Sequence, residues 1–179
     1  MRRIFPLLAA AFLLTACVDE PGTSSPTARH APSAGQKLAV RAISNKSQQF
    51  GLEDTLALAV RDEFLRDGRY QLVPEKEADD VVAITITHYL LTPLAYDSTL
   101  APISYKLRIL ADVRMLDRAT DRELWKEKDL EGSLTYPNQI LAGGQTEDQA
   151  RATIWTVLAP MIVSRVVDGF NEPVKPVVK

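Results

Sequence analysis

Side chains that could act as nucleophiles or proton carriers are few and scattered. The only cysteine is Cys17, and the two histidines are His30 and His88. Catalysis by any of them requires an activating partner within hydrogen-bond reach, and no Ser/His/Asp pattern, glycine-rich phosphate loop or metal-ligand spacing is present. Asp79 and Asp80 are adjacent before a strand-like segment, where neighbouring side chains point to opposite faces, so we interpret them as a solvated turn. The sequence therefore predicts neither an enzyme nor a bound metal or cofactor.

Cys17 follows a segment with the order of parts of a secretory signal peptide. Arg2 and Arg3 precede an uncharged, mostly apolar run, Ile4–Leu14. As a helix this run spans about 16 Å, which is too short for the ~30 Å hydrocarbon core of a membrane. The run LTAC that ends at Cys17 resembles the bacterial lipobox. That resemblance implies cleavage before the cysteine, a diacylglycerol on its thiol and an acyl chain on its new amine.

The opening RRIF would also suit a twin-arginine signal, but Pro6 and the short basic region disfavour it. Two or more acyl chains anchor a protein stably, whereas one holds it only marginally. The next residue is Val18, where enteric bacteria place Asp to retain a lipoprotein in the inner membrane. The predicted location is therefore the outer membrane, through a lipid anchor.

Composition divides the chain into four parts. We expect residues 1–16 to be the signal peptide, 17–36 the acylated cysteine and a flexible tether, 37–170 a single domain, and 171–179 a disordered, proline-broken tail. The formal net charge of −2 provides no bulk attraction for nucleic acid.

Hydrophobic periodicity predicts the element order β-α-β-β-β-β-α. The expected strands are 37–43, 70–73, 81–91, 103–117 and 124–136, and the expected helices are 51–68 and 146–170. Gly68 suits a helix C-cap, and Thr146 with Gln149 forms a capping-box pattern. Two amphipathic helices on one face of a mainly antiparallel, four- to five-stranded sheet give a two-layer α+β sandwich.

The strand at 103–117 has the clearest alternation in the sequence. Its odd-numbered positions up to Met115 carry the apolar face. The other face is polar and largely basic, with Lys106, Arg108 and Arg114. In the strand at 81–91 we expect one core-facing set, formed by Val82, Ile84, Ile86 and Leu90.

The succession of segments resembles a known family. A lipobox and tether lead to LAVRAISNKSQQFGLEDTLALAVRDEFLRDGRYQLV, then ADDVVAITITHYLLTPLAYD, ISYKLRILADVRMLDRATDRELWKEKDLEGSLTY and TEDQARATI. This resembles the LptE family of lipopolysaccharide-assembly lipoproteins. The resemblance implies a non-enzymatic protein that plugs the LptD β-barrel of the outer membrane, assists its assembly and supports delivery of lipopolysaccharide to the cell surface.

A plug in a barrel needs a polar exterior, because barrel interiors are polar. Lys106, Arg108 and Arg114 could pair with carboxylates of the lumen or with lipid A phosphates, although an ordinary solvated sheet face would look the same.

Family members tend to have basic residues in the loops before the long strand and before the last helix. Here the segments 92–102 and 136–146 contain no Lys or Arg. Their apolar residues, for which we expect contacts with barrel or acyl chain, are Leu94, Tyr96, Leu100, Ile140 and Leu141.

Two other functions fit a tethered α+β domain. One is an auxiliary lipoprotein of an ABC-type lipid transporter, and the other is a lipoprotein that regulates a cell-wall synthase. The three hypotheses differ in the partner: an LptD-like barrel with possible lipopolysaccharide binding, an inner-membrane permease, or a periplasmic enzyme domain.

Overall fold

The computed structural model describes residues 35–168, which fold into two helices, one 3-10 turn and six strands. In chain order these are β1 (Lys37–Val40), β2 (Ser44–Asn45), α1 (Leu52–Asp67), β3 (Gln71–Leu72), η1 (Glu75–Glu77), β4 (Asp80–Tyr96), β5 (Pro102–Asp117), β6 (Glu123–Pro137) and α2 (Glu147–Asp168). The predicted signal peptide, Cys17, His30 and the C-terminal tail lie outside the described residues.

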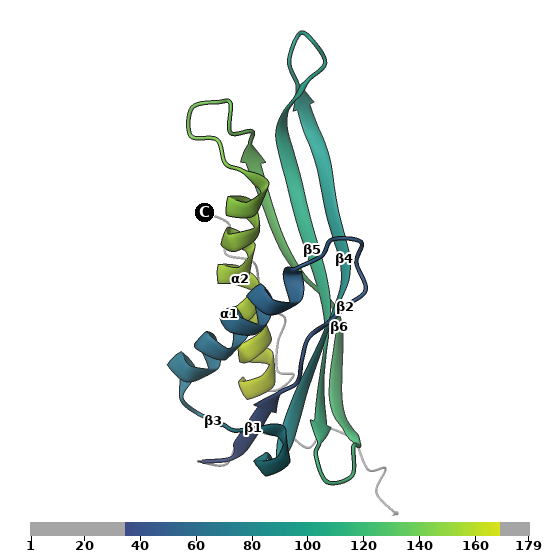
Figure 1. Cartoon of the computed structure of the whole chain (residues 1–179), viewed down its shortest axis with the longest axis vertical. Helices are drawn as coiled ribbons and strands as arrows, with labels where there is room; N and C mark the ends of the chain where they lie inside the picture. Colours follow the sequence, from purple (N-terminus) through teal and green to yellow (C-terminus); the bar gives the residue numbers. More distant parts are fainter. Residues whose placement is uncertain (1–34, 169–179) are drawn as a thin grey trace, which may run out of the picture.

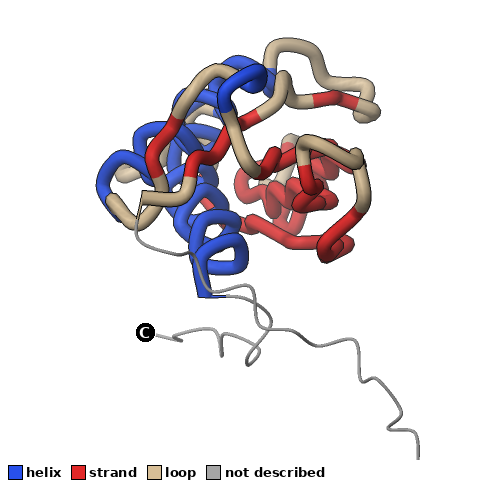
Figure 2. Tube along the Cα trace, turned by 90° about the horizontal axis from the view of Figure 1, so that it is seen from below, coloured by secondary structure: helices blue, strands red, loops and turns tan. Residues whose placement is uncertain are grey.

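The two helices form one layer and the sheet forms the other (Figures 1 and 2). The strand order is β3-β1-β4-β5-β6, with β2 pairing separately with β4. The short strands β1, β2 and β3 pair in parallel, whereas β4, β5 and β6 form a long antiparallel meander. The predicted two-layer α+β fold is confirmed, and the additional strand is the two-residue β2.

Both helices bury one apolar stripe against the sheet. In α1 the stripe repeats every four residues, at Leu52, Leu56, Val60 and Phe64. Spacing of this kind keeps side chains on one helical face. Gly68 ends α1 in the left-handed conformation (φ 73°), and its N–H donates to the carbonyl oxygen of Phe64. The predicted C-cap is thus confirmed.

Helix α2 begins with the predicted capping box. The N–H of Gln149 donates to Oγ1 of Thr146 at 3.1 Å, and the N–H of Thr146 donates to Oε1 of Gln149 at 2.9 Å. The length and hydropathy of α2 would suit a membrane span, but 50% of that stretch is buried inside the domain. Because α2 packs on α1, β5 and β6, its apolar residues serve the core.

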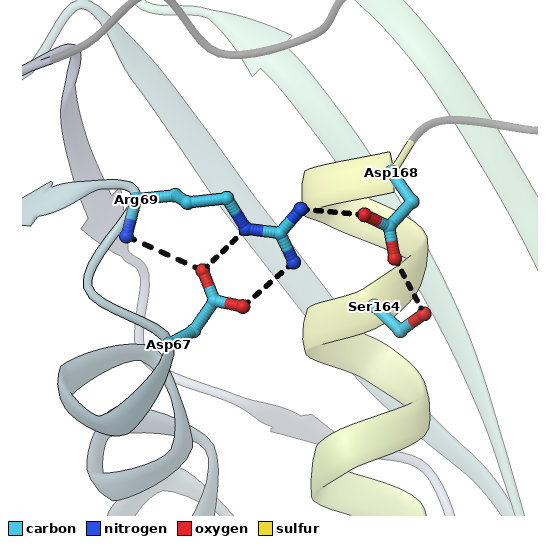
Figure 3. A network of polar contacts seen from close by, with 4 residues as sticks. All are labelled: Asp67, Arg69, Ser164 and Asp168. Carbon is cyan, nitrogen blue, oxygen red and sulfur yellow. Dashed lines mark hydrogen bonds and ion pairs between the residues drawn. The ribbon is translucent and has the colours of Figure 1, made fainter.

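The C-terminal ends of the helices are joined by polar contacts (Figure 3). Arg69, which follows α1, binds Asp67 at 2.7 Å and Asp168 of α2 at 2.6 Å. Ser164 donates to the other carboxylate oxygen of Asp168 at 3.0 Å. Arg69 lowers the pKa of both carboxyl groups through these hydrogen bonds.

A β-bulge at Thr87 divides β4 into two parts. Ile86 pairs with Ala111, but the next pair is His88 with Leu110, so Thr87 has no partner residue of its own. Its hydroxyl donates to the carbonyl oxygen of Leu110 at 3.2 Å. We call residues 88–110, the β4–β5 hairpin beyond the bulge, the arm; Figure 1 shows it extending past both helices.

The bulge corrects one sequence prediction. Leu90 was expected to face the core with Ile84, but the extra residue in β4 inverts the alternation beyond it. Tyr89 and Leu91 therefore take the helix side of the sheet, and Leu90 lies on the outer face, opposite Arg108.

The end of the sheet away from the arm is covered on both faces. We call β1, β3, η1 and residues 80–86 of β4 the base. The helices cover one face, and a small apolar cluster covers the other, consisting of Ala39, Ala78, Val81, Ala83, Leu116 and Val73. Asp80 is buried here and accepts a hydrogen bond from Nε2 of Gln36 at 2.5 Å. The predicted solvated turn is therefore wrong for Asp80, since it opens β4, and right for exposed Asp79.

Candidate functional site

The outer face of β5 carries the three predicted cations. Lys106, Arg108 and Arg114 are half-buried and alternate with the buried residues that face the helices. Lys106 lies between Thr92 of β4 and Thr135 of β6, whereas Arg114 lies between Ala83 and Lys126. The predicted division of this strand into a core face and a polar face is confirmed.

Only one of these cations is neutralised by a neighbour. Nε of Arg108 donates to Glu131 at 2.8 Å and its Nη2 to the second oxygen at 2.5 Å, a bidentate pair that lowers the pKa of Glu131. Within residues 35–168, Lys106 and Arg114 form no ion pair. Eight residues of strand separate them by about 26 Å. They are therefore separate contact points along one face and do not form a single anion pocket.

The tip of the arm presents the predicted apolar residues. Oδ1 of Asp97 accepts hydrogen bonds from the N–H groups of Thr99 and Ala101 and from the hydroxyl of Thr99, which holds the turn closed and lowers the pKa of Asp97. Leu100, at φ 65°, is 81% exposed, and Tyr96 is 53% exposed. The turn thus projects apolar side chains outward on an ordered support.

The predicted loop 92–102 is mostly strand. β4 continues to Tyr96 and pairs with β5 from Pro102 onward, which leaves residues 97–101 as the turn. Pro93 lies inside this strand, which is possible because a strand edge tolerates a proline where no ladder hydrogen bond is lost. The loop between β6 and α2, with exposed Ile140 and Leu141, lies toward the same end of the molecule (Figure 1).

A polar hollow that the sequence did not predict lies where the arm meets the start of α2. Its volume is about 440 Å³, and its lining includes Tyr105, Tyr136 and Arg151. The rings of Tyr105 and Tyr136 stack with centroids 5.8 Å apart. Beside the hollow, the hydroxyl of Tyr89 donates to Glu147 at 2.5 Å, and burial, followed by this bond, raises the pKa of Tyr89. Residues 58 positions apart make this contact, so no local pattern signals it.

The described residues offer no catalytic arrangement. His88 is exposed on the arm, and its pairing partner in β5 is apolar Leu110. No group of three or more His, Cys, Asp or Glu side chains within residues 35–168 could hold a metal ion. The chemistry that this domain offers is that of contact surfaces: an outer face with cations and a projecting arm with exposed leucines.

The fold and these surfaces define a two-layer α+β domain with an uncovered outer sheet face and a projecting hairpin. The sequence matches the LptE family, described as lipopolysaccharide-assembly, over residues 35–166. The chain belongs to this family. It is therefore a lipopolysaccharide-assembly lipoprotein of a non-enzymatic family, associated with a membrane.

Solved structures are similar to this chain at low sequence identity, and the first one described here shares its fold. The protein CT253 from Chlamydia trachomatis aligns with a TM-score of 0.54 and 13% identity over 75% of this chain and 96% of its own. The lipoprotein GNA1162 from Neisseria meningitidis has a TM-score of 0.44 and 16% identity over 75% and 99%. A minor lipoprotein from Acinetobacter baumannii has a TM-score of 0.44 and 15% identity over 76% and 90%. No curated protein sequence matches this chain.

Proposed function

We propose that this protein is the lipid-anchored partner of an LptD-type β-barrel in the outer membrane. It plugs the barrel, assists its assembly and supports delivery of lipopolysaccharide to the cell surface. The observation that carries the proposal is the family match across residues 35–166, which covers every described helix and strand except the last two residues of α2.

The surface of the sheet supports this role. A plug must place polar groups against the polar wall of a barrel. The outer face of β5 offers Lys106 and Arg114 without a neutralising partner in the described part of the chain, and their charges suit carboxylates of a lumen wall or phosphates of lipopolysaccharide. We include direct binding of lipopolysaccharide in the proposal and assign it to the outer face of β5. The loops at 92–102 and 136–146 lack Lys and Arg, so they do not provide a basic binding site.

Anchoring belongs to the same proposal. Diacylglycerol on the thiol of Cys17 and an acyl chain on its amine would hold the chain in the outer membrane, and residues 18–36 would separate the anchor from the domain. The measurement is mass spectrometry of the mature N-terminal peptide from wild type and from Cys17→Ala. An unprocessed, unacylated N-terminus in the wild type would contradict this part.

The partner is tested by purification. A C-terminally tagged full chain is extracted from envelopes in mild detergent, and the proteins that accompany it are identified. A stoichiometric outer-membrane β-barrel is the expected result. Inner-membrane transporter subunits would replace the proposal with the ABC-transporter role, and a periplasmic synthase would replace it with the regulatory role.

Charge reversal then tests the contact face. Lys106→Glu combined with Arg114→Glu is expected to lower barrel recovery several-fold, because like charges across an interface repel. The control is Arg61→Glu, which changes an exposed cation on α1, beside β1 and β3 rather than on the outer face of β5. Equal recovery of barrel with both variants would exclude the outer face as the contact.

A further inference from the structure

The arm leaves one side of β4 without a neighbouring strand. β1 pairs with β4 only as far as Val82, and β2 only as far as Ile86. The last main-chain contact on that side is the N–H of Lys46, which donates to the carbonyl oxygen of Ile86 at 2.8 Å. Within residues 35–168, the strand beyond the bulge pairs with β5 alone.

This unpaired side has a defined length. It begins at His88, after the bulge, and its regular part ends at Thr92, because Pro93 lacks an N–H and the register shifts again between Pro93 and Ala95. In an antiparallel ladder about half of a strand's main-chain groups point away from the neighbour that pairs with it. We call residues 88–92 the open edge.

Side chains along the open edge do not protect it. From Val81 to Tyr96 the strand contains no Asp, Glu, Lys or Arg. Two leucines of the open edge point to opposite faces of the sheet. Leu90 lies on the outer face and is 39% exposed, and Leu91 lies on the helix side and is 36% exposed. Exposed sheet edges normally carry charges, bulges or covering segments that prevent pairing with another chain.

The other long edge of the sheet shows that protection. Charged residues recur in β6 between Glu123 and Glu131, and the strand is irregular near Asp129, which adopts φ 56°. A bulge combined with charges twists an edge away from a partner strand. The edge of β6 is therefore protected over residues 123–131, whereas the edge of β4 has a short stretch between its bulge and Pro93 that is regular, uncharged and exposed.

We infer that the open edge receives an extended segment of the barrel partner as an added β-strand. The inference rests on the proposed function and specifies how the partner is held. Free main-chain donors and acceptors are matched by another extended chain, and two flanking leucines select apolar, uncharged side chains in it. Pro93 limits the added strand to about five residues, because it lacks the N–H that a longer ladder needs.

Amide hydrogen exchange tests the pairing directly. The acylated full chain is purified with its barrel, and again from a host that lacks the barrel. The amide protons of residues 88–92 that point away from β5 are expected to exchange at least about tenfold more slowly in the complex, because added ladder bonds protect them. Amides of β5 between Leu107 and Val113, which are paired in both states, provide the reference.

Each outcome has a distinct meaning. A purified complex whose edge amides exchange as in the barrel-free protein overturns the inference and leaves the proposed function intact. Absence of any barrel overturns both. Protection that appears without the barrel and grows with protein concentration assigns the edge to a second copy of this chain, which also overturns the inference.

A charge placed on the edge gives an independent test. Leu90→Lys is expected to lower barrel recovery at least about tenfold, because a lysine on an edge strand opposes pairing. The matched control is Leu58→Lys on α1, where the leucine is 63% exposed. Both variants should retain the wild-type unfolding midpoint, and equal barrel recovery by the two would contradict the inference.

Discussion

The two ends of the sheet differ in how much of their surface the rest of the chain covers. At the base, helices pack on one face, a small apolar cluster packs on the other, and β1 and β3 extend the sheet beyond β4. On the arm, the outer face is uncovered and β4 lacks a neighbour on one side. The base is therefore enclosed on both faces, whereas the arm buries Leu107 and Ile109 on its helix side and leaves its outer face and one edge available to another molecule.

Polar groups differ less sharply between the two ends. At the base, Asp80 accepts from Gln36, and Arg41, which follows β1, pairs with Glu75 at 2.6 Å. The arm also has paired groups, since Arg108 binds Glu131 and Tyr89 donates to Glu147. On the arm, Lys106 has no ion pair within residues 35–168, and the main-chain groups of the open edge are unpaired there. Unpaired main-chain N–H and C=O groups lie beside exposed leucines on the arm. This combination is typical of a surface that binds another molecule.

The largest expected difference in the free energy of unfolding is between two truncations, one on each side of the bulge. Ile84→Ala is expected to lower the free energy of unfolding by about 2–5 kcal/mol, because it opens a cavity in the core. Ile84 is 2% exposed, whereas Leu90 is 39% exposed. Leu90→Ala should therefore cost less than about 1 kcal/mol. Urea unfolding followed by circular dichroism measures both, and equal losses would mean that the arm is as integral to folding as the base.

The bulge itself is the next test. Deletion of Thr87 would remove the bulge and place Ile86 directly before His88. The pairings of His88 with Leu110 and of Leu90 with Arg108 would be kept, so Leu90 should stay on the outer face. We expect a loss of about 1–3 kcal/mol in the free energy of unfolding, because β4 must give up the local bend and twist of the bulge. Thr87→Ala keeps the bulge and removes only the bond to Leu110, so it should cost about 1 kcal/mol.

The two Thr87 variants separate the backbone shape of the bulge from the bond made by its side chain. If the deletion costs no more than Thr87→Ala, the backbone shape of the bulge contributes nothing to stability. Cysteine-accessibility labelling at position 90 in each variant gives an independent readout of which face the residue occupies.

The sequence predicted the base and the helices well because their signals are local. Periodicity located the α1 stripe from Leu52 to Phe64, and cap chemistry located Gly68 and Thr146. The alternation of β5 predicted correctly that Lys106, Arg108 and Arg114 share the face away from the helices. These features depend on residues a few positions apart.

The arm was predicted less well because its geometry depends on pairing between distant residues. A threonine in a β-prone run gives no sign that it is bulged, so the inversion at Thr87 and the outward turn of Leu90 were missed. The segment 92–102 was expected to be a loop, although β4 continues through Pro93 to Tyr96. Glu131 as the partner of Arg108 follows only from the β5–β6 register.

Gly132 of β6 marks a close approach between the sheet and α2. A Cβ at this position would lie 2.6 Å from Cγ2 of Ile154 and 3.3 Å from Cβ of Leu158. Gly132→Val is therefore expected to cost about 1–3 kcal/mol through overpacking. The control is Ser133→Val, one residue along on the exposed outer face, which should leave stability unchanged within about 0.5 kcal/mol.

The unfolding midpoints of the two β6 valine variants define where the covered region of the sheet ends. Loss in both would show that the outer face of β6 is packed in solution, contrary to the exposure of Ser133. Loss in Gly132→Val alone supports close contact between α2 and the sheet beside the root of the arm.

The smallest effect is expected at the helix ends, where Arg69 joins Asp67 and Asp168 (Figure 3). Arg69→Gln should cost about 0.5–1 kcal/mol at neutral pH, since the arginine is 47% exposed and surface pairs contribute little. Both aspartates have a pKa lowered by Arg69, so the stabilisation is present above about pH 4, the pKa of an unfolded aspartate, and is lost as the pH falls through their folded pKa values.

The pH dependence distinguishes this link from packing. Wild type and Arg69→Gln should differ in unfolding midpoint at pH 7 and converge as the pH falls below the lowered pKa values of Asp67 and Asp168, where these carboxyl groups are protonated in both states. Arg66→Gln, which alters an exposed i,i+3 pair within α1 alone, is the control and should show a smaller difference at pH 7. A difference between wild type and Arg69→Gln that persists unchanged at acid pH would mean that the stem of Arg69, rather than its charge, holds the ends of α1 and α2 together.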